Sequence, residues 1–233
     1  MSAATMAAAT ESVFGLTELR ATLRRTLSFL TGIGIPCLMV PRATGFISGV
    51  RIVDGGLHVD ATATASNVLH EAGHLSVLPG RFRRQANDDI DAVVSLMLDS
   101  VDFSNPDIGE ARAALQASDV EATAWAWAAG LEIGLAPSQI IMDAEYDGTG
   151  ADVRQQLQLG AYLGINGLAA ARFCVTRPAL EKVYGRPAYP KLAMWLQKDF
   201  EPLPVLEVLV APLDETPTSK EAPPRPLRRR RAA

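Results

Sequence analysis

Apolar residues recur every three or four positions between Thr10 and Gly32, which is the spacing of one face of an α-helix. The apolar positions are Val13, Leu16, Leu19, Leu23, Leu27 and Leu30. Residues 1–9 are small and of low complexity, and we expect them to form a flexible N-terminus. The pattern therefore predicts that the folded part of the chain begins with an amphipathic helix near Thr10.

Three short runs rich in apolar and β-branched residues follow this helix and predict strands. They cover residues 35–40, 46–53 and 57–60, and Asp54-Gly55-Gly56 between the last two runs is a hairpin turn signal. We expect a small antiparallel sheet with an edge beside the next helix, where an extended peptide could add as a further strand.

The next predicted helix is apolar on several sides, as expected of a buried element. Ser66 or Asn67 can cap its start, and Pro79-Gly80 ends it. Gly73, near its middle, weakens a helix by about 1 kcal/mol relative to alanine. We expect so small a residue to let a substrate or another backbone approach closely.

This helix carries the motif His70-Glu71-Ala72-Gly73-His74, in which two histidines flank a glutamate at His-Glu-x-x-His spacing. Side chains four residues apart share a helix face, so both histidines can bind one cation, and neutral imidazole suits Zn²⁺. Glu71 can take a proton from a water molecule at that cation. Because the chain has only three histidines, chance rarely produces this motif, and it predicts a zinc site.

Catalytic zinc usually has three protein ligands, and a carboxylate must be the third here because no other histidine is well placed. The best candidate is Glu121, in a predicted buried helix where an unpaired carboxylate would be costly. Ser118-x-x-Glu121 is also a capping box, in which Glu121 would only bind backbone N–H groups. We favour Glu121 as the ligand, with Asp119 second and Glu110 a distant third.

Taken as a whole, the arrangement of residues 11–180 resembles the ImmA/IrrE-type metallopeptidases. The resemblance rests on the leading helix, the short sheet, the His-Glu-x-x-His motif and the later run Asp119-Val120-Glu121-Ala122-Thr123-Ala124-Trp125-Ala126. It implies a zincin-like peptidase with Glu121 as third zinc ligand and Glu71 as base. Family members often cleave or bind transcriptional repressors in the cytoplasm. The 47 positions (121 − 74) from the motif to Glu121 exceed the spacing that we expect for the family.

Composition and charge limit the other classes of function. The net charge of −4 argues against a generally nucleic-acid-binding surface. No apolar stretch reaches the ~20 residues needed to span a bilayer, no secretory signal is evident, and two isolated cysteines fit a reducing compartment. Residues 212–233 are proline-rich and end in four arginines, so we expect a disordered basic tail, the one segment suited to nucleic acid.

These patterns predict an α+β protein with a flexible N-terminus (1–9), one zincin-like metallopeptidase domain (10–211) and a disordered tail (212–233). In the domain, a small antiparallel sheet packs against a helical bundle that carries the His-Glu-x-x-His helix. The predicted function is zinc-dependent hydrolysis of a peptide bond in a protein substrate, with regulatory proteins as candidates, in the cytoplasm. The alternative is a zinc-containing binding module that grips a regulatory protein with little turnover. A nucleic-acid-associated role through the tail is disfavoured, because no helix-turn-helix pattern is present.

Overall fold

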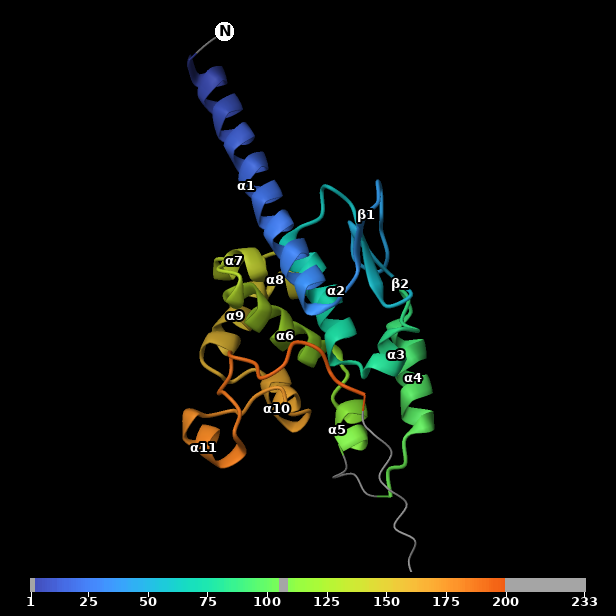
Figure 1. Cartoon of the computed structure of the whole chain (residues 1–233). Helices are drawn as coiled ribbons and strands as arrows, with labels where there is room; N and C mark the ends of the chain where they lie inside the picture. The colour runs from blue at the N-terminus through green and yellow to red at the C-terminus, as the bar shows by residue number, and fades with distance from the viewer. Residues whose placement is uncertain (1–2, 105–108, 200–233) are drawn as a thin grey trace, which may run out of the picture. The chain divides into compact units, whose positions relative to one another are not determined.

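The computed structural model describes the backbone of residues 3–104 and 109–199, and the side chains of these residues except 3–16 and Glu110. The predicted basic tail, residues 212–233, lies outside the described residues, and so does the side chain of the candidate ligand Glu110. The described part is a mixed α+β fold, as predicted, with a small sheet among helices (Figure 1).

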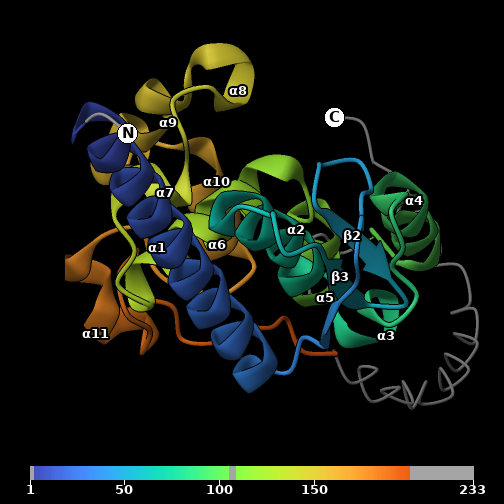
Figure 2. The same ribbon diagram turned by 90° about the horizontal axis from the view of Figure 1, so that it is seen from above.

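The first helix, α1, spans Ala3–Ile33 and crosses over α2 (Ala65–Val77), as Figures 1 and 2 show. It begins at Ala3 rather than near Thr10, and so includes most of the segment that the sequence analysis expects to be flexible. The sequence there is rich in alanine, the residue with the highest helix propensity, which accounts for the earlier start. Leu23 and Leu30 lie on its buried face.

The sheet contains β1 (Cys37–Met39), β2 (Val50–Val53) and β3 (Gly56–Val59) in the order β1-β3-β2. β2 and β3 form the predicted antiparallel hairpin, and its two turn residues, Asp54 and Gly55, have φ angles of 47° and 77°. Positive φ at both positions is the requirement of a two-residue type I′ turn. The prediction of an antiparallel sheet is wrong for β1, which pairs in parallel with β3. β3 lies between β1 and β2, and it runs antiparallel to β2 and parallel to β1.

Two helices form the centre of the fold, α2 and α6 (Asp119–Glu132), and they share the most extensive contact between elements. The two backbones come into close contact at Gly73, where an added Cβ would overlap the carbonyl oxygen of Ala122. The close neighbour of Gly73 is therefore another backbone, one of the two alternatives expected from the sequence. Trp125 and Trp127 of α6 are almost fully buried, which anchors α6 in the core.

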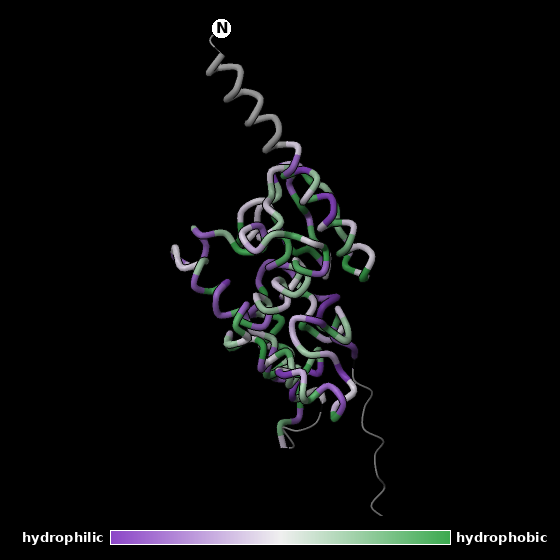
Figure 3. Tube along the Cα trace, turned by 90° about the vertical axis from the view of Figure 1, so that its left-hand side faces the viewer, coloured by the Kyte–Doolittle hydropathy of each residue, from purple (hydrophilic) through white to green (hydrophobic). Residues whose placement is uncertain are grey.

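The other helices are short, and α10 packs on the face of α6 away from α2. Their bounds are α3 Gly80–Arg83, α4 Ile90–Ser100, α5 Gly109–Leu115, α7 Pro137–Ile140, α8 Glu145–Gly148, α9 Gly150–Gln158, α10 Leu163–Ala170, η1 Pro178–Leu180 and α11 Glu181–Tyr184. Figure 3 shows hydrophobic and hydrophilic residues alternating along the trace, as expected where helices pack one face on a shared core. None of the described helices combines the length and apolar character needed to cross a bilayer.

Candidate metal centre

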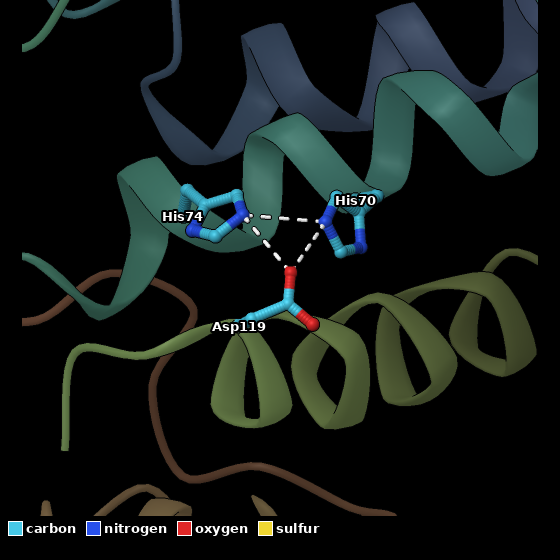
Figure 4. A group of neighbouring side chains, drawn as sticks. All are labelled: His70, His74 and Asp119. Carbon is cyan, nitrogen blue, oxygen red and sulfur yellow. Dashed lines mark hydrogen bonds and ion pairs between the residues drawn. The ribbon is translucent and has the colours of Figure 1, made fainter. Parts of the chain in front are cut away.

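Three side chains from two helices converge where α2 faces the start of α6: His70, His74 and Asp119 (Figure 4). The Nε2 atoms of the two histidines are 3.2 Å apart. The Oδ1 atom of Asp119 lies 3.1 Å from His70 Nε2 and 3.7 Å from His74 Nε2. Within the described ranges, no other set of three histidine, cysteine or acidic side chains comes close enough together to hold a metal ion.

The local sequence of α2 explains how the histidines are presented. The helix is capped by Thr64, whose side chain accepts from the N–H of Asn67 at 3.1 Å, so the cap lies before the predicted Ser66 or Asn67. Ser66 instead donates to the carbonyl of Ile140 at 2.7 Å and ties α2 to the end of α7. With the apolar side chains of α2 buried in the core, the four-residue spacing turns both imidazoles toward α6.

The C-terminal end of α2 is fixed by a partly buried arginine. Arg83 donates to the carbonyls of Leu75, Leu78 and Gln197 at 2.7, 2.8 and 2.6 Å. These carbonyls include groups that the end of the helix would otherwise leave unpaired, and a cation is favourable at this negative end. Burial lowers the pKa of Arg83 to about 10, so the guanidinium stays charged at neutral pH. Arg83 was not predicted as a structural residue, because an arginine that caps a helix looks like any other surface charge in the sequence.

Asp119 and Glu121 stand close together in the sequence but face different parts of the molecule. Asp119 is the first residue of α6 and reaches the histidines, whereas Glu121 forms the capping box with Ser118. The Glu121 carboxylate accepts from the Ser118 hydroxyl and from the Ser118 N–H, the latter at 3.3 Å. Two residues on a helix are about 200° apart, so one helix cannot turn both carboxylates to the same ion.

The surroundings of Glu121 keep it away from the site. The residue is 4% exposed, and a Cβ added at Gly167 of α10 would overlap its carboxylate. Burial raises the pKa of Glu121, while its bonds to Ser118 act in the opposite direction. The structure therefore does not bring the favoured third ligand, Glu121, to His70 and His74. It brings the second candidate, Asp119.

Glu71, the predicted base, lies next to the converging groups. It lines the same cavity as His74 and Asp119, is 7% exposed, and has no hydrogen-bond partner among the described residues. Burial raises its pKa from 4.5 to about 7; the charge of His70 opposes the shift, and Asp88 and Asp119 add to it. A carboxyl group with a pKa near neutrality can both accept and release a proton at working pH.

The electrostatics of His74 favour the neutral ring that metal binding requires. Burial lowers its pKa from 6.5 to about 4, the charge of His70 lowers it further, and Asp119 acts in the opposite direction. The Nδ1 atom of His74 is buried without a hydrogen-bond partner in the described part of the chain. The ring is therefore oriented by packing and by the groups at Nε2.

Two cavities adjoin the site, and Asp119 lines both. The larger, of about 670 Å³, reaches the site through Glu71 and His74. The smaller, of about 290 Å³, reaches it through His70. Phe46 lines the first and Ile47 the second, so the loop between β1 and β2 borders both cavities. The sequence predicts a strand over residues 46–53, and nothing in that pattern indicates that Phe46 and Ile47 lie in a loop beside the site.

Two side chains and one backbone N–H group occupy the free edge of β2. The N–H of Ile52 donates to Asp88 Oδ1 at 2.9 Å, and the N–H of Asp54 donates to Asn87 Oδ1 at 3.1 Å. The carbonyl of Val50 accepts from Gly45 at 2.8 Å. β2, which packs on α2, therefore does not offer the open edge for an added peptide strand that the sequence analysis expects.

Tyr146 brings a hydroxyl group to the smaller cavity. It lines that cavity with His70 and Asp119, and its hydroxyl is 2.8 Å from the Thr123 hydroxyl. Burial raises the pKa of Tyr146, so the phenol stays protonated at neutral pH. Its φ angle is 56° and that of Asp147 is 55°, and such backbone strain in non-glycine residues is concentrated at functional sites.

Comparisons of this chain with protein-family models, with curated proteins and with solved structures find no match. The function is therefore argued from the side chains of the site and from the cavities beside them.

Proposed function

We propose that this protein is a zinc-dependent peptidase in which His70, His74 and Asp119 hold the metal ion and Glu71 is the base. The observation that carries the proposal is the convergence of three donor atoms beside a buried, unpaired carboxyl group. Asp119 replaces Glu121 in the ligand set that the resemblance to ImmA/IrrE-type metallopeptidases implies. Membership of that family is likewise a proposal.

The separations between the donor atoms fit a tetrahedral zinc site. With metal–ligand distances of about 2.0–2.1 Å, tetrahedral geometry places any two ligand atoms about 3.3 Å apart. The observed separations are 3.1, 3.2 and 3.7 Å. Three protein ligands leave a fourth position open, which is the pattern of catalytic rather than structural zinc. The Asp119 side chain is 64% exposed, so the open position can be reached from solvent.

Zinc held there supplies Lewis-acid chemistry, acidifying water and polarising the scissile carbonyl. Glu71 would take the proton of the attacking water and transfer it to the nitrogen of the leaving amine. Its burial supports this role, because a carboxyl group that is neutral after the first transfer can act as the acid in the second. Tyr146, protonated and beside His70, would donate a hydrogen bond to the developing oxyanion.

A cytoplasmic location is also part of the proposal. It is supported by Cys37 and Cys174, which are both free thiols, as expected in a reducing compartment.

The proposal is tested by comparing the wild type with Glu71→Gln, each loaded with zinc, on a degenerate peptide library. We expect equal zinc content and loss of cleavage by at least about 100-fold, within the usual contribution of a general base. Glu132→Gln makes the same chemical change at an exposed position of α6 and should cleave like the wild type. Equal cleavage by the wild type and Glu71→Gln would overturn the assignment of the base. If neither cleaves any peptide, the peptidase proposal falls and the binding module becomes the better account.

A further inference from the structure

The larger cavity beside the metal centre has an uneven distribution of charge. Its described lining contains five carboxylates and no lysine or arginine. They come from three parts of the chain: α2, the start of α4 and the start of α6. The five residues are Glu71, Asp88, Asp89, Asp91 and Asp119. The fold therefore gathers like charges from distant positions around one space, which is unfavourable unless a cation occupies it.

Some of these charges are already compensated within the protein. Asp88 is paired with Arg51 at 2.7 Å, and Asp89 accepts from the N–H of Ala92 at 3.0 Å, capping α4. Asp91 is exposed in the first turn of α4 and has no side-chain partner among the described residues. Asp119 would be a ligand of the proposed metal ion, which leaves Asp91 and Glu71 as the acids of the cavity without a partner among the described residues.

A second observation, independent of the surface acids, is the burial of Glu71. It is more than nine-tenths buried, lines this cavity and has no hydrogen-bond partner in the part of the chain that is described. Its carboxyl group therefore borders the cavity without a protein partner, where a ligand that enters the cavity can meet it.

Apart from His74 and Ser118, the rest of the lining is apolar. Phe46 is 94% exposed at the rim, and Ile90 and Val94 of α4 are partly buried. An exposed aromatic ring can stack on a guanidinium or ammonium group, and aliphatic side chains suit the methylene stem of a lysine or arginine. A cavity that combines apolar side chains with acidic groups therefore matches a long cationic side chain.

A metal ion fits this cavity less well than an organic cation does. Within the described residues, the acids of the cavity do not form a second set of three close enough to share one ion. Carboxylates spread over a wide space suit a ligand whose charge lies at the end of a long stem.

Building on the peptidase function above, we propose that this cavity selects substrates with a lysine or arginine next to the scissile bond. The basic residue would lie next to the scissile bond because Glu71 and His74 line the cavity and also belong to the proposed catalytic centre.

The test uses the full-length, zinc-loaded protein and a degenerate peptide library that contains arginine and citrulline in equal amounts. Citrulline has nearly the shape of arginine but no charge. Sequencing the cleavage products gives the ratio of arginine to citrulline next to the cleaved bond. We expect a ratio of about ten, because the carboxylates that line the cavity attract the charge of arginine, which citrulline lacks.

Asp91→Asn should lower this ratio about threefold, because it removes one of those charges. Asp99→Asn removes a charge from the same helix at an exposed position outside the cavity lining, and should leave the ratio unchanged. Cleavage with a ratio near one in the wild type would overturn this inference and leave the peptidase function standing. Equal ratios in the wild type and Asp91→Asn would show that the cavity is not the source of the preference. Absence of any cleavage would overturn the peptidase function itself.

Discussion

Asp119 and Glu121 lie two residues apart at the start of α6, and they serve opposite sides of the helix. Asp119 Oδ1 is 3.1 Å from His70 Nε2, whereas the Glu121 carboxylate accepts hydrogen bonds from Ser118 and faces α10. The two carboxylates therefore have separate roles. One would complete the metal centre, and the other fixes the helix end that positions its neighbour.

This division predicts that Ser118→Ala weakens folding without weakening metal binding. Loss of the hydroxyl group that donates to the buried Glu121 carboxylate should lower the free energy of unfolding by about 1 kcal/mol, measured by urea denaturation. The zinc dissociation constant should change less than threefold, because Asp119 keeps its place. Ser95→Ala, the same substitution at an exposed position inside α4, should be neutral or slightly stabilising, since alanine favours helix. A large loss of zinc affinity in Ser118→Ala alone would contradict the division.

The sequence was sufficient for those features that depend on local periodicity. The pairing of His70 and His74 follows from the four-residue repeat of a helix, and the β2–β3 hairpin follows from the preference of Asp54-Gly55 for positive φ. Both depend only on residues close together in the chain. The burial of α6 followed in the same way from its run of alanine and tryptophan.

The third ligand and the sheet topology depend on contacts that the sequence does not display. The sequence allowed Glu121 to be either a metal ligand or a member of the capping box. In the structure it belongs to the capping box, because α10 packs against that side of α6 at Gly167. The parallel pairing of β1 with β3 is set by where the hairpin inserts, which no local pattern specifies. The link from Asp88 to the edge of β2 joins residues 36 positions apart, so only the folded chain reveals it.

Gly73 should be intolerant of a side chain. An added Cβ would overlap the Ala122 carbonyl, so Gly73→Ala must push α2 and α6 apart. We expect a loss of at least about 2 kcal/mol in the free energy of unfolding, within the range of overpacking in cores. Gly32→Ala in α1, where nothing lies within 4 Å of the added atom, should instead gain up to about 1 kcal/mol. Similar effects of the two substitutions would argue against the close helix contact.

The metal-free protein should show an unusual pH dependence that arises from Glu71. Its pKa is raised from 4.5 to about 7 by burial, so between these values the unfolded chain has released a proton that the folded chain keeps. Stability must therefore fall as the pH rises from about 4.5 to 7, by about 3 kcal/mol for this residue. Glu71→Gln removes this loss and should be the more stable protein at pH 8, measured by urea denaturation in the presence of a chelator.

The contribution of His74 to stability should change with pH in the opposite direction to that of Glu71, over an overlapping pH range. Burial lowers its pKa from 6.5 to about 4, so between these values the unfolded chain binds a proton that the folded chain does not. Its contribution to stability therefore rises as the pH increases through this range and is lost on acidification. In the same assay, His74→Gln should lose less stability than the wild type between pH 6.5 and pH 4. If both variants showed the wild-type pH profile, neither group would be buried as described.

The most direct test of the account is the zinc affinity of wild type, Asp119→Ala and Glu121→Ala, measured by competition with a chelating dye. Removing one of three protein ligands should weaken zinc binding by at least about 100-fold, beyond the 10- to 100-fold effect of losing an outer-shell partner. We predict this loss for Asp119→Ala, while Glu121→Ala loses stability but binds zinc within about threefold of the wild type. The reverse result, with affinity lost only in Glu121→Ala, would contradict the proposed metal centre.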